Sequence, residues 1–320
     1  MQQIQNQNII EMLSLLINNN QQNKHDINEI IKYWINDNII RCRPSTVDYY
    51  NKILKELLPI FRMYNVFYIE DITINKLNEI VSYLKQLKKY KNNTINKFIC
   101  TIKQITHFSY KYDYTEYDLI QKYPKLKKDD VETIIINKSD ITKILKYLET
   151  LDINNKINLR NILFIYLLKD TGARINEIRN IKLNNIDFET NTILLSYTKT
   201  NKNRKVYFTE PTKELLYKFI ESVKPKDYIM CNVDTKLQIN RANLYTFITK
   251  IKNECNISQS ISPHKWRHTL ATELVNLNIN LENVRKLLGH SSLETTKKYL
   301  HVNDTLQHNI IMDALDKLNK

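Results

Sequence analysis

Glycine and proline are scarce in this chain, which has 2 glycines and 6 prolines among its 320 residues. Because these two residues mark most turns, many connections have to be recognised from other signals. Each glycine therefore stands out as a position where the backbone needs a conformation that other residues avoid. The abundant residues Asn, Ile, Lys and Tyr have AT-rich codons, so this bias reflects the genome as much as the protein.

Cysteine is also rare, and the 4 cysteines are scattered without a C-x-x-C pair. Their spacing argues against a zinc site and a disulfide framework. The longest apolar run, residues 162–168, is far shorter than the ~20 residues of a membrane span. The Gln/Asn-rich N-terminus lacks the order of a signal peptide. We therefore expect a cytoplasmic protein with no membrane segment, no metal and no cofactor.

Acidic residues are in deficit, with 34 Asp and Glu against 48 Lys and Arg and a net charge of +14. An excess of this size favours a polyanionic partner, first a nucleic acid and second an anionic membrane surface. A lysine-rich surface without such a partner is the alternative, and part of the lysine excess shares the codon bias of the chain.

The chain is long enough for two domains. Residues 1–25 read as a polar tail, and residues 26–120 carry apolar residues at helical spacing, which predicts a small helical domain. In it Pro59 is expected to end or kink a helix. Basic residues 85–91 join two of its helices, which is compatible with a DNA clamp or with a solvated lysine face.

Residues 121–130 read as a linker, and residues 131–320 as a second domain with mixed helix and strand. Helical spacing predicts helices at 138–151 and 159–169 and several more towards the C-terminus. Three short segments with polar turns, residues 186–188, 192–197 and 204–208, predict strands. The expected fold class is therefore α+β, mainly helical with a small antiparallel sheet.

The first candidate motif is TGARINEI, residues 171–178, which follows the apolar segment 159–169. Gly172 predicts a turn with an unusual backbone, and Arg174 comes next to it. Taken alone, Arg174 could equally be an ordinary surface arginine.

The second motif is the basic turn TKTNKNRK, residues 198–205, whose Lys199 could deliver an ammonium group to a phosphate or to a leaving oxygen. A solvated polar turn is the alternative.

The third motif is SPHKWRH, residues 262–268. Ser262 and Pro263 are typical of a helix start, which places His264 and Arg267 three residues apart in the first turn. The unpaired N–H groups of a helix N-terminus add positive potential, so the motif predicts an anion site. A capped helix with incidental polar residues is the alternative.

The fourth motif is LLGHSSLETTKKYLH, residues 287–301. Gly289 suits the end of one helix, and His290 lies in the corner before the next helix, in which Tyr299 is about two turns along. With 20 tyrosines in the chain, any single one is more often part of a core or surface than a nucleophile. It is the order of the four motifs that carries the inference.

This order resembles the catalytic domain of the tyrosine recombinases, also called the phage integrase family, and within it the Xer-type recombinases. The resemblance covers about residues 138–301 and is weaker for the helical first half, which is similar to the family's core-binding domain in size and pattern. It implies the catalytic set Arg174, Lys199, His264, Arg267, His290 and Tyr299. The chain departs mildly from the family pattern at Trp266, where a smaller apolar residue is common.

The resemblance implies a site-specific recombinase that cuts and rejoins DNA through a 3′-phosphotyrosyl link to Tyr299. Arg174 and Arg267 would clamp the phosphate, His264 would act as base, Lys199 as acid, and His290 would support the nucleophile. The covalent link conserves bond energy, so neither ATP nor metal is expected. Other lysines crowd the turn of Lys199, so a neighbouring one could be the acid.

The implied partners are double-stranded DNA with paired half-sites and three further copies of the chain. The tetramer would assemble through a C-terminal helix at about residues 303–318, and the protein would associate with the nucleoid. A type IB topoisomerase and a catalytically inactive DNA-binding relative are the alternatives. The sequence leaves open whether the biological role is Xer-like resolution or the integration and excision of a mobile element.

Overall fold

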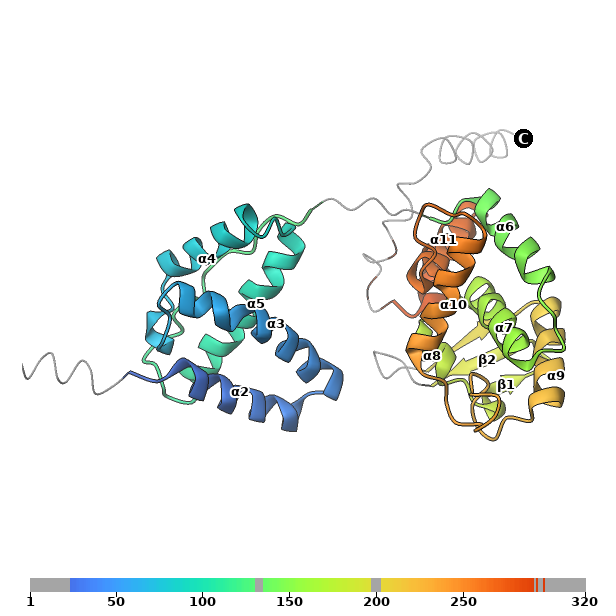
Figure 1. Ribbon diagram of the computed structural model, residues 1–320, viewed down its shortest axis with the longest axis horizontal. Helices are drawn as coiled ribbons and strands as arrows, with labels where there is room; N and C mark the ends of the chain where they lie inside the picture. Colours follow the sequence, from blue (N-terminus) through green and yellow to red (C-terminus); the bar gives the residue numbers. More distant parts are fainter. Residues whose placement is uncertain (1–23, 130–134, 197–202, 291, 293–295, 297–320) are drawn as a thin grey trace, which may run out of the picture. The chain divides into compact units, whose positions relative to one another are not determined.

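A computed structural model describes residues 24–129, 135–196, 203–290, 292 and 296 (Figure 1). The chain divides into two compact units, Met1–Val131 and Glu132–Lys320. Each unit has a large apolar core of its own. The two units are described separately.

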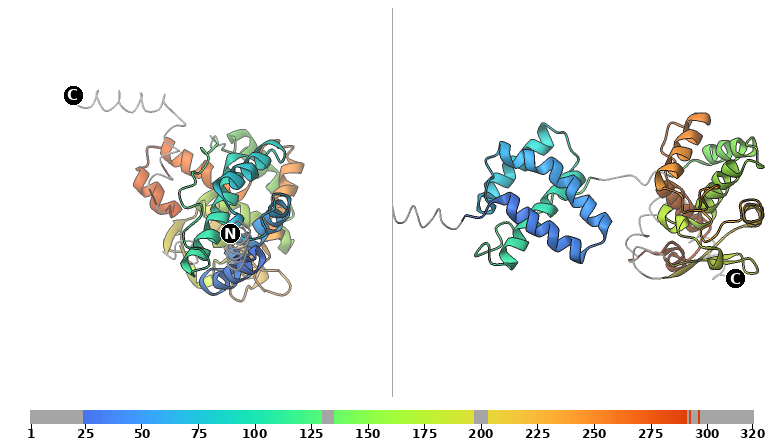
Figure 2. Two further views of the ribbon diagram at one scale, coloured as in Figure 1. Left: turned by 90° about the vertical axis from the view of Figure 1, so that its left-hand side faces the viewer. Right: turned by 60° about the horizontal axis from the view of Figure 1, so that its bottom comes forward.

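The first unit is helical. Its main helices are α2 (Ile27–Arg41), α3 (Pro44–Met63), α4 (Ile74–Gln86) and α5 (Asn92–Lys111). A short 3-10 helix, η1 (Ile69–Asp71), precedes α4. Helix α5 packs against the other three (Figures 1 and 2). Its apolar residues recur at intervals of three and four, so they form one face that is buried in the core.

The sequence had predicted that α3 would end or kink at Pro59. The helix does not end there and continues to Met63. Proline removes one backbone hydrogen bond from a helix interior. Here Leu57 and Phe61 on either side of the proline are buried, with exposed fractions of 0% and 1%. Their packing against the core keeps the segment helical despite the missing bond.

The segment predicted as a linker lies against the first unit up to residue 129. Tyr123 is buried, and its hydroxyl donates to Oδ1 of Asn78 at 2.7 Å. Asn96 on α5 binds the backbone of Leu126 twice, accepting from its N–H at 2.8 Å and donating to its carbonyl at 2.9 Å. These contacts make residues 120–129 part of this unit.

The second unit is built around α7 (Lys156–Thr171). Its other helices are α6 (Lys138–Glu149), α8 (Ile175–Arg179), α9 (Glu210–Val223), α10 (Arg241–Glu254), α11 (Pro263–Asn276) and α12 (Leu281–Leu288). Helix α7 contacts α8, α9, α10 and α11 (Figure 1). Its sequence is apolar on nearly all sides, which suits a helix enclosed by others. Helix α10 was not predicted.

The sheet of this unit has the order β1 (Ile186–Asp187), β2 (Thr192–Leu195) and β3 (Arg204–Tyr207), all antiparallel, after a 3-10 turn η2 (Leu183–Asn185). The cross-strand pair Ile193 and Val206 is fully buried. The next pair, Leu194 and Lys205, is exposed. Successive side chains on a strand point to opposite faces, so Arg204 lies on the inner face. The expected α+β fold class is confirmed.

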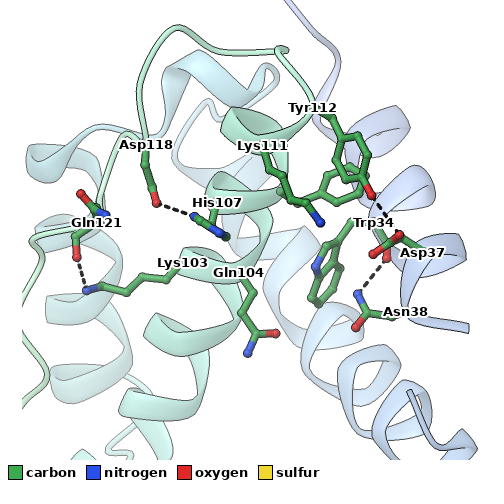
Figure 3. A pocket seen from close by; sticks show the side chains of 11 residues that line it. Trp34, Asp37, Asn38, Lys103, Gln104, His107, Lys111, Tyr112, Asp118 and Gln121 are labelled. Atoms are coloured by element: carbon green, nitrogen blue, oxygen red, sulfur yellow. Dashed lines mark hydrogen bonds and ion pairs between the residues drawn. The ribbon is translucent and has the colours of Figure 1, made fainter. Parts of the chain in front are cut away.

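A hollow of about 420 Å³ in the first unit lies beside α2 and α5 (Figure 3). Several of its lining side chains are held by neighbours. Lys103 Nζ donates to the Gln121 carbonyl at 2.8 Å, and His107 Nδ1 lies 3.1 Å from an Asp118 carboxylate oxygen. Both acidic and basic side chains line the hollow. The predicted catalytic residues all belong to the second unit.

Candidate active site

The turn between α7 and α8 determines where Arg174 lies. Gly172 ends α7 in the left-handed conformation with a φ of 54°, which strains any residue with a side chain. A Cβ at this position would lie 2.9 Å from Cδ2 of Leu270 and 3.1 Å from Cδ2 of Leu288. The bare backbone therefore lets the end of α7 pack closely on α11 and α12. The expectation of an unusual backbone at Gly172 is confirmed.

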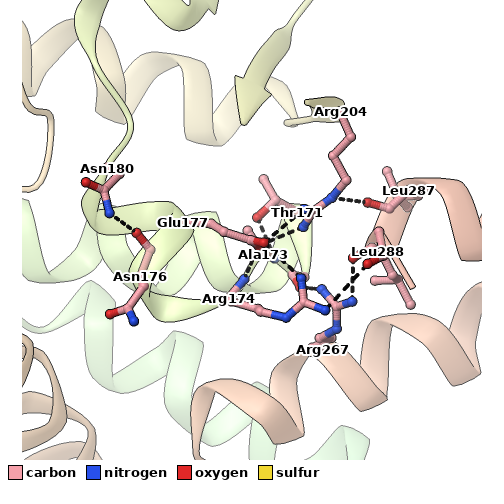
Figure 4. Close-up of polar contacts among 12 residues, drawn as sticks. Thr171, Ala173, Arg174, Asn176, Glu177, Asn180, Arg204, Arg267, Leu287 and Leu288 are labelled. Atoms are coloured by element: carbon pink, nitrogen blue, oxygen red, sulfur yellow. Dashed lines mark hydrogen bonds and ion pairs between the residues drawn. The ribbon is translucent and has the colours of Figure 1, made fainter. Parts of the chain in front are cut away.

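Arg174 is the N-cap residue of α8, and its partner is the buried Glu177 one turn later. Oε1 of Glu177 accepts from Nη1 of Arg174 at 2.9 Å and from Nη1 of Arg204 at 3.0 Å. Oε2 accepts from Nη2 of Arg204 at 2.7 Å and from the backbone N–H of Arg174, also at 2.7 Å. One carboxylate is thus shared by two arginines (Figure 4).

Burial by itself would raise the pKa of the Glu177 carboxyl. The hydrogen bonds and positive charge of Arg204, followed by the backbone hydrogen bond and charge of Arg174, together outweigh burial and lower this pKa. Glu177 is therefore ionised at neutral pH. It is the counter-charge that permits two guanidinium groups to lie side by side.

Arg267 reaches the same region from α11. The residue is 4% exposed, and a buried charge requires hydrogen-bond acceptors. Its Nη1 donates to the carbonyl of Gly172 at 3.0 Å, and its Nη2 donates to the carbonyl of Leu288. These two carbonyls end α7 and α12, so Arg267 ties the ends of both helices to α11.

The last carbonyls of a helix have no partner within it and carry negative potential. At the end of α12, four guanidinium groups donate to four consecutive carbonyls. The pairs are Arg204 to Leu287 at 2.8 Å, Arg267 to Leu288, Arg174 to Gly289 at 3.5 Å and Arg285 to His290 at 2.8 Å. The end of α12 is thus the point where arginines from several elements meet (Figure 4).

His290 follows directly on Gly289, which ends α12 with a φ of 66°. His290 is 7% exposed, and Nδ1 of its imidazole lies 2.8 Å from Oγ1 of Thr296. Because one ring nitrogen is occupied by this contact, the orientation of the ring is fixed. The predicted place of His290 directly after the end of a helix is confirmed, whereas the helix expected to follow it lies outside the described residues.

His264 lies in the first turn of α11, as predicted, and is exposed. The backbone carbonyl of Ser262 accepts from the N–H groups of Lys265 at 2.8 Å and Trp266 at 3.2 Å, so the helix begins as expected. Trp266 is 2% exposed and fills the core of the unit. Arg267 turns inwards from the same helix turn from which His264 points outwards.

Four of the six predicted catalytic residues fall in the described part of the chain. Of these, Arg174, Arg267 and His290 are brought together around the end of α12. Lys199 and Tyr299, the predicted acid and nucleophile, lie outside the described residues. The predicted C-terminal helix lies outside them as well.

Glu177 and Arg204 were not assigned a role from the sequence, although both stand inside the quoted motifs. The signal for Glu177 is its spacing, because a carboxylate three residues after an arginine at a helix start can reach back to it. The signal for Arg204 is its place at an inward strand position, where a charge must have a buried partner.

Within the described ranges, no group of three or more His, Cys, Asp or Glu residues is placed to hold a metal ion. In the same ranges, every helix is too short or too polar to cross a membrane.

The model of the phage integrase family matches residues 135–305, more than half of the chain. A probable integrase/recombinase of Acholeplasma phage L2 is 28% identical over 81% of this chain and 88% of its own. The tyrosine recombinase XerC of Staphylococcus epidermidis is 32% identical over 54% of this chain and 59% of its own. The structure of the XerH site-specific recombinase has the same fold, with a TM-score of 0.68, 20% identity and coverage of 86% and 81%.

The chain belongs to the phage integrase family, and it is a tyrosine recombinase, an enzyme of site-specific recombination. The family prediction made from the four motifs is confirmed, and type IB topoisomerase activity is not favoured.

Proposed function

We propose that this recombinase cuts and rejoins DNA through a 3′-phosphotyrosyl bond to Tyr299, with Arg174 and Arg267 binding the scissile phosphate. One observation carries the proposal: the two guanidiniums, 93 residues apart in the sequence, donate to the adjacent carbonyls of Gly289 and Leu288, next to His290. Arginines this close together are suited to an anion with two acceptor oxygens.

The hydrogen bonds to Gly172, Glu177 and the end of α12 serve to fix the planes of these guanidiniums before substrate arrives. Donors that need no rearrangement stabilise a transition state best. Negative charge builds up on the two non-bridging oxygens as the tyrosyl oxygen attacks phosphorus. Two oriented guanidiniums would oppose that charge directly.

The remaining roles follow the family resemblance. His264, exposed at the start of α11, is the candidate base for the Tyr299 hydroxyl. His290 donates to a phosphate oxygen, and Lys199 protonates the departing 5′-oxygen. The 5′-hydroxyl of a partner strand then attacks the phosphotyrosine, which restores the phosphodiester bond and releases Tyr299.

The positions of Arg204 and Lys205 in β3 support the choice of Lys199 as the acid. Arg204 is bound to Glu177 and Leu287 on the inner face of the sheet. Lys205 is the next residue on the strand and therefore faces the opposite side. Lys199 remains the assignment, and Lys202 is the alternative in the same turn.

We further propose that the substrate is double-stranded DNA with paired half-sites. The XerH structure named above is a complex with its difH substrate, and the charge of +14 suits a polyanion. The helical first unit would act as the core-binding domain, with the lysines between α4 and α5 contacting the DNA backbone. The protein would then act in the cytoplasm, on the nucleoid.

Tyr299→Phe tests the central assignment, because it deletes only the hydroxyl nucleophile. The assay uses a nicked duplex from which the cut fragment diffuses away, so covalent protein–DNA adducts accumulate. EDTA is present and nucleotide is omitted. We expect adducts from the wild-type protein and none from the variant, with unchanged DNA binding. Adducts formed by Tyr299→Phe would disprove the assignment.

We also propose that four copies of the chain assemble on two DNA duplexes through the C-terminal helix. Ile310, Ile311, Ala314, Leu315 and Leu318 fall at helical spacing and would give that helix an apolar stripe. Docked on a neighbouring copy, the stripe would link the active sites in a ring.

Deletion of residues from Asn309 onward tests this assembly. We expect the truncated protein to bind a single half-site normally, to lose cooperative assembly on paired sites and to lose recombination. Band-shift and recombination assays on a two-site substrate measure the two effects. Normal assembly and recombination would show that the helix has no such role.

A further inference from the structure

Arg204 is a buried arginine at a position where a strand normally carries an apolar residue. It pairs with Leu195 across the sheet, on the face that includes Ile193 and Val206. The Arg204 side chain is 8% exposed. All of the nitrogens at the end of the side chain are bound: Nη1 and Nη2 to the two oxygens of Glu177, and Nε to the carbonyl of Leu287. Three of the five N–H donors of Arg204 are thus directed at acceptors within the protein.

Burying a charge pair costs desolvation that an apolar pair would avoid. An apolar residue at this inward position would satisfy the strand pattern, so packing alone does not account for the arginine. What the arginine adds is a connection between three elements. It joins β3, the N-terminus of α8 and the end of α12, and no aliphatic side chain could hold all three by hydrogen bonds.

The backbone at the end of α12 leaves space for this connection. A Cβ on Gly289 would lie 2.9 Å from Nη1, 3.0 Å from Cδ and 3.1 Å from Cζ of Arg204. The guanidinium has little room to move aside, because three hydrogen bonds hold it. Gly289 thus permits both the left-handed turn before His290 and the close approach of Arg204.

We propose that Arg204 is a positioning residue of the recombinase, which holds Glu177 in the orientation that fixes the guanidinium of the catalytic Arg174. Each carboxylate oxygen of Glu177 accepts one hydrogen bond from Arg174 and one from Arg204. The two hydrogen bonds from Arg204 form a bidentate fork. The carboxylate plane, and with it the position of Arg174, is therefore set by Arg204.

This proposal rests on the proposed function, because it requires that Arg174 bind the scissile phosphate. Arg204→Lys is the primary test, since lysine keeps the charge but cannot form the fork. We expect DNA affinity to stay within about twofold, because phosphate contacts elsewhere dominate it. Single-turnover cleavage at saturating DNA should fall by on the order of 10²-fold, as for other small displacements of a catalytic group.

A purely structural role is separated by charge removal. Arg204→Met removes the hydrogen bonds to Glu177 and Leu287 but leaves Arg174 as the counter-charge of Glu177, so the melting temperature should fall moderately. Cleavage is then compared with wild type well below both melting temperatures, where the folded fractions are equal. If Arg204 positions Arg174, cleavage by Arg204→Met stays low under these conditions. Wild-type cleavage at equal folded fraction would show a purely structural role and would overturn the proposal.

Arg160→Met is the matched control, because Arg160 is also buried, at 7% exposure, in the same unit. Its hydrogen bonds go to Asn161 and the carbonyl of Cys231, and not to the arginine cluster. At equal folded fraction it should cleave DNA at the wild-type rate. A loss of cleavage equal to that of Arg204→Lys would show that any lost buried arginine has this effect, and would overturn the proposal.

The route through Arg174 is tested in an Arg174→Lys background. Residues that act through one another have non-additive effects, so Arg204→Lys should slow cleavage far less there than in the wild-type protein. Full additivity would overturn the route. Failure of the wild-type chain itself to form adducts would contradict the proposed function, whereas normal adduct formation by Arg204→Lys would contradict only this inference.

Discussion

The lysines at the end of α4 and in the connection to α5 form one dense group of positive charge, and the arginines at the end of α12 form another. Their surroundings are opposite. Lys85, Lys88, Lys89 and Lys91 are exposed. Arg204 and Arg267 are almost completely enclosed. An exposed lysine stays hydrated and can move between several anionic partners. An enclosed arginine is held in one position by the acceptors around it.

This difference matches two tasks in handling DNA. Affinity for the backbone needs only charge at the surface, because phosphates repeat along the duplex. Cleavage needs donors at fixed positions around one phosphate. The comparison therefore predicts that substitutions among the arginines affect reaction rate, and substitutions among the lysines affect binding.

The largest effect is expected for lysine at the clamp positions. Arg174→Lys and Arg267→Lys keep the charge but lose the planar fork, so each should slow cleavage by on the order of 10²-fold or more. Covalent-adduct formation on the nicked substrate measures the rate, with DNA affinity as the control. If both variants cleave at near-normal rates, the enclosed arginines do not bind the reacting phosphate.

A second effect concerns stability. Glu177→Gln leaves Arg174 and Arg204 without their shared counter-charge, and breaking a buried pair in this way costs about 3 kcal/mol of unfolding free energy. The Glu177 side chain is 2% exposed, whereas that of Glu282 in the pair with Arg285 is 44% exposed. Glu282→Gln is therefore the matched control, and urea unfolding should show little change for it. Equal losses in the two variants would remove the distinction between enclosed and exposed pairs.

The same variant has a pH signature. The pKa of Glu177 is lowered in the folded state, so the stability that its charge contributes is present above the ordinary carboxyl pKa. That stability is lost as pH falls through the lowered pKa. Glu177→Gln should lack this part of the acid-side loss. Identical acid profiles for the variant and the wild-type protein would contradict the assignment of that loss to Glu177.

The sequence was sufficient to predict the family, the fold class and the places of Gly172 and His290. These inferences rest on local signals, such as helical spacing and the two isolated glycines. Helix α10 carries a similar signal, because Leu244, Ile248 and Ile251 are buried at helical spacing after the capping Asn240. The sequence therefore contained enough information to predict α10.

The link between Glu177 and Arg204 could not be obtained in the same way. The two residues are 27 positions apart, and their contact depends on β3 lying beside the first turn of α8. Strand alternation places Arg204 inwards but does not identify its partner. Likewise, helical spacing made His264 and Arg267 neighbours, but only the packing of α11 shows that Arg267 is enclosed and His264 exposed.

The smallest effect is expected among the exposed lysines. In Lys85→Gln with Lys88→Gln, each lost phosphate contact should reduce the slope of log affinity against log salt by about 1. Affinity for DNA should fall several-fold at low salt, alike for specific and unrelated sequences, while cleavage at saturating DNA stays unchanged. The double variant with arginine at both positions keeps the charge and should bind with a wild-type slope. An unchanged slope in the glutamine variant would mean that the α4–α5 connection does not touch the backbone. A fall in cleavage at saturating DNA would mean that exposed lysines also position the reacting phosphate.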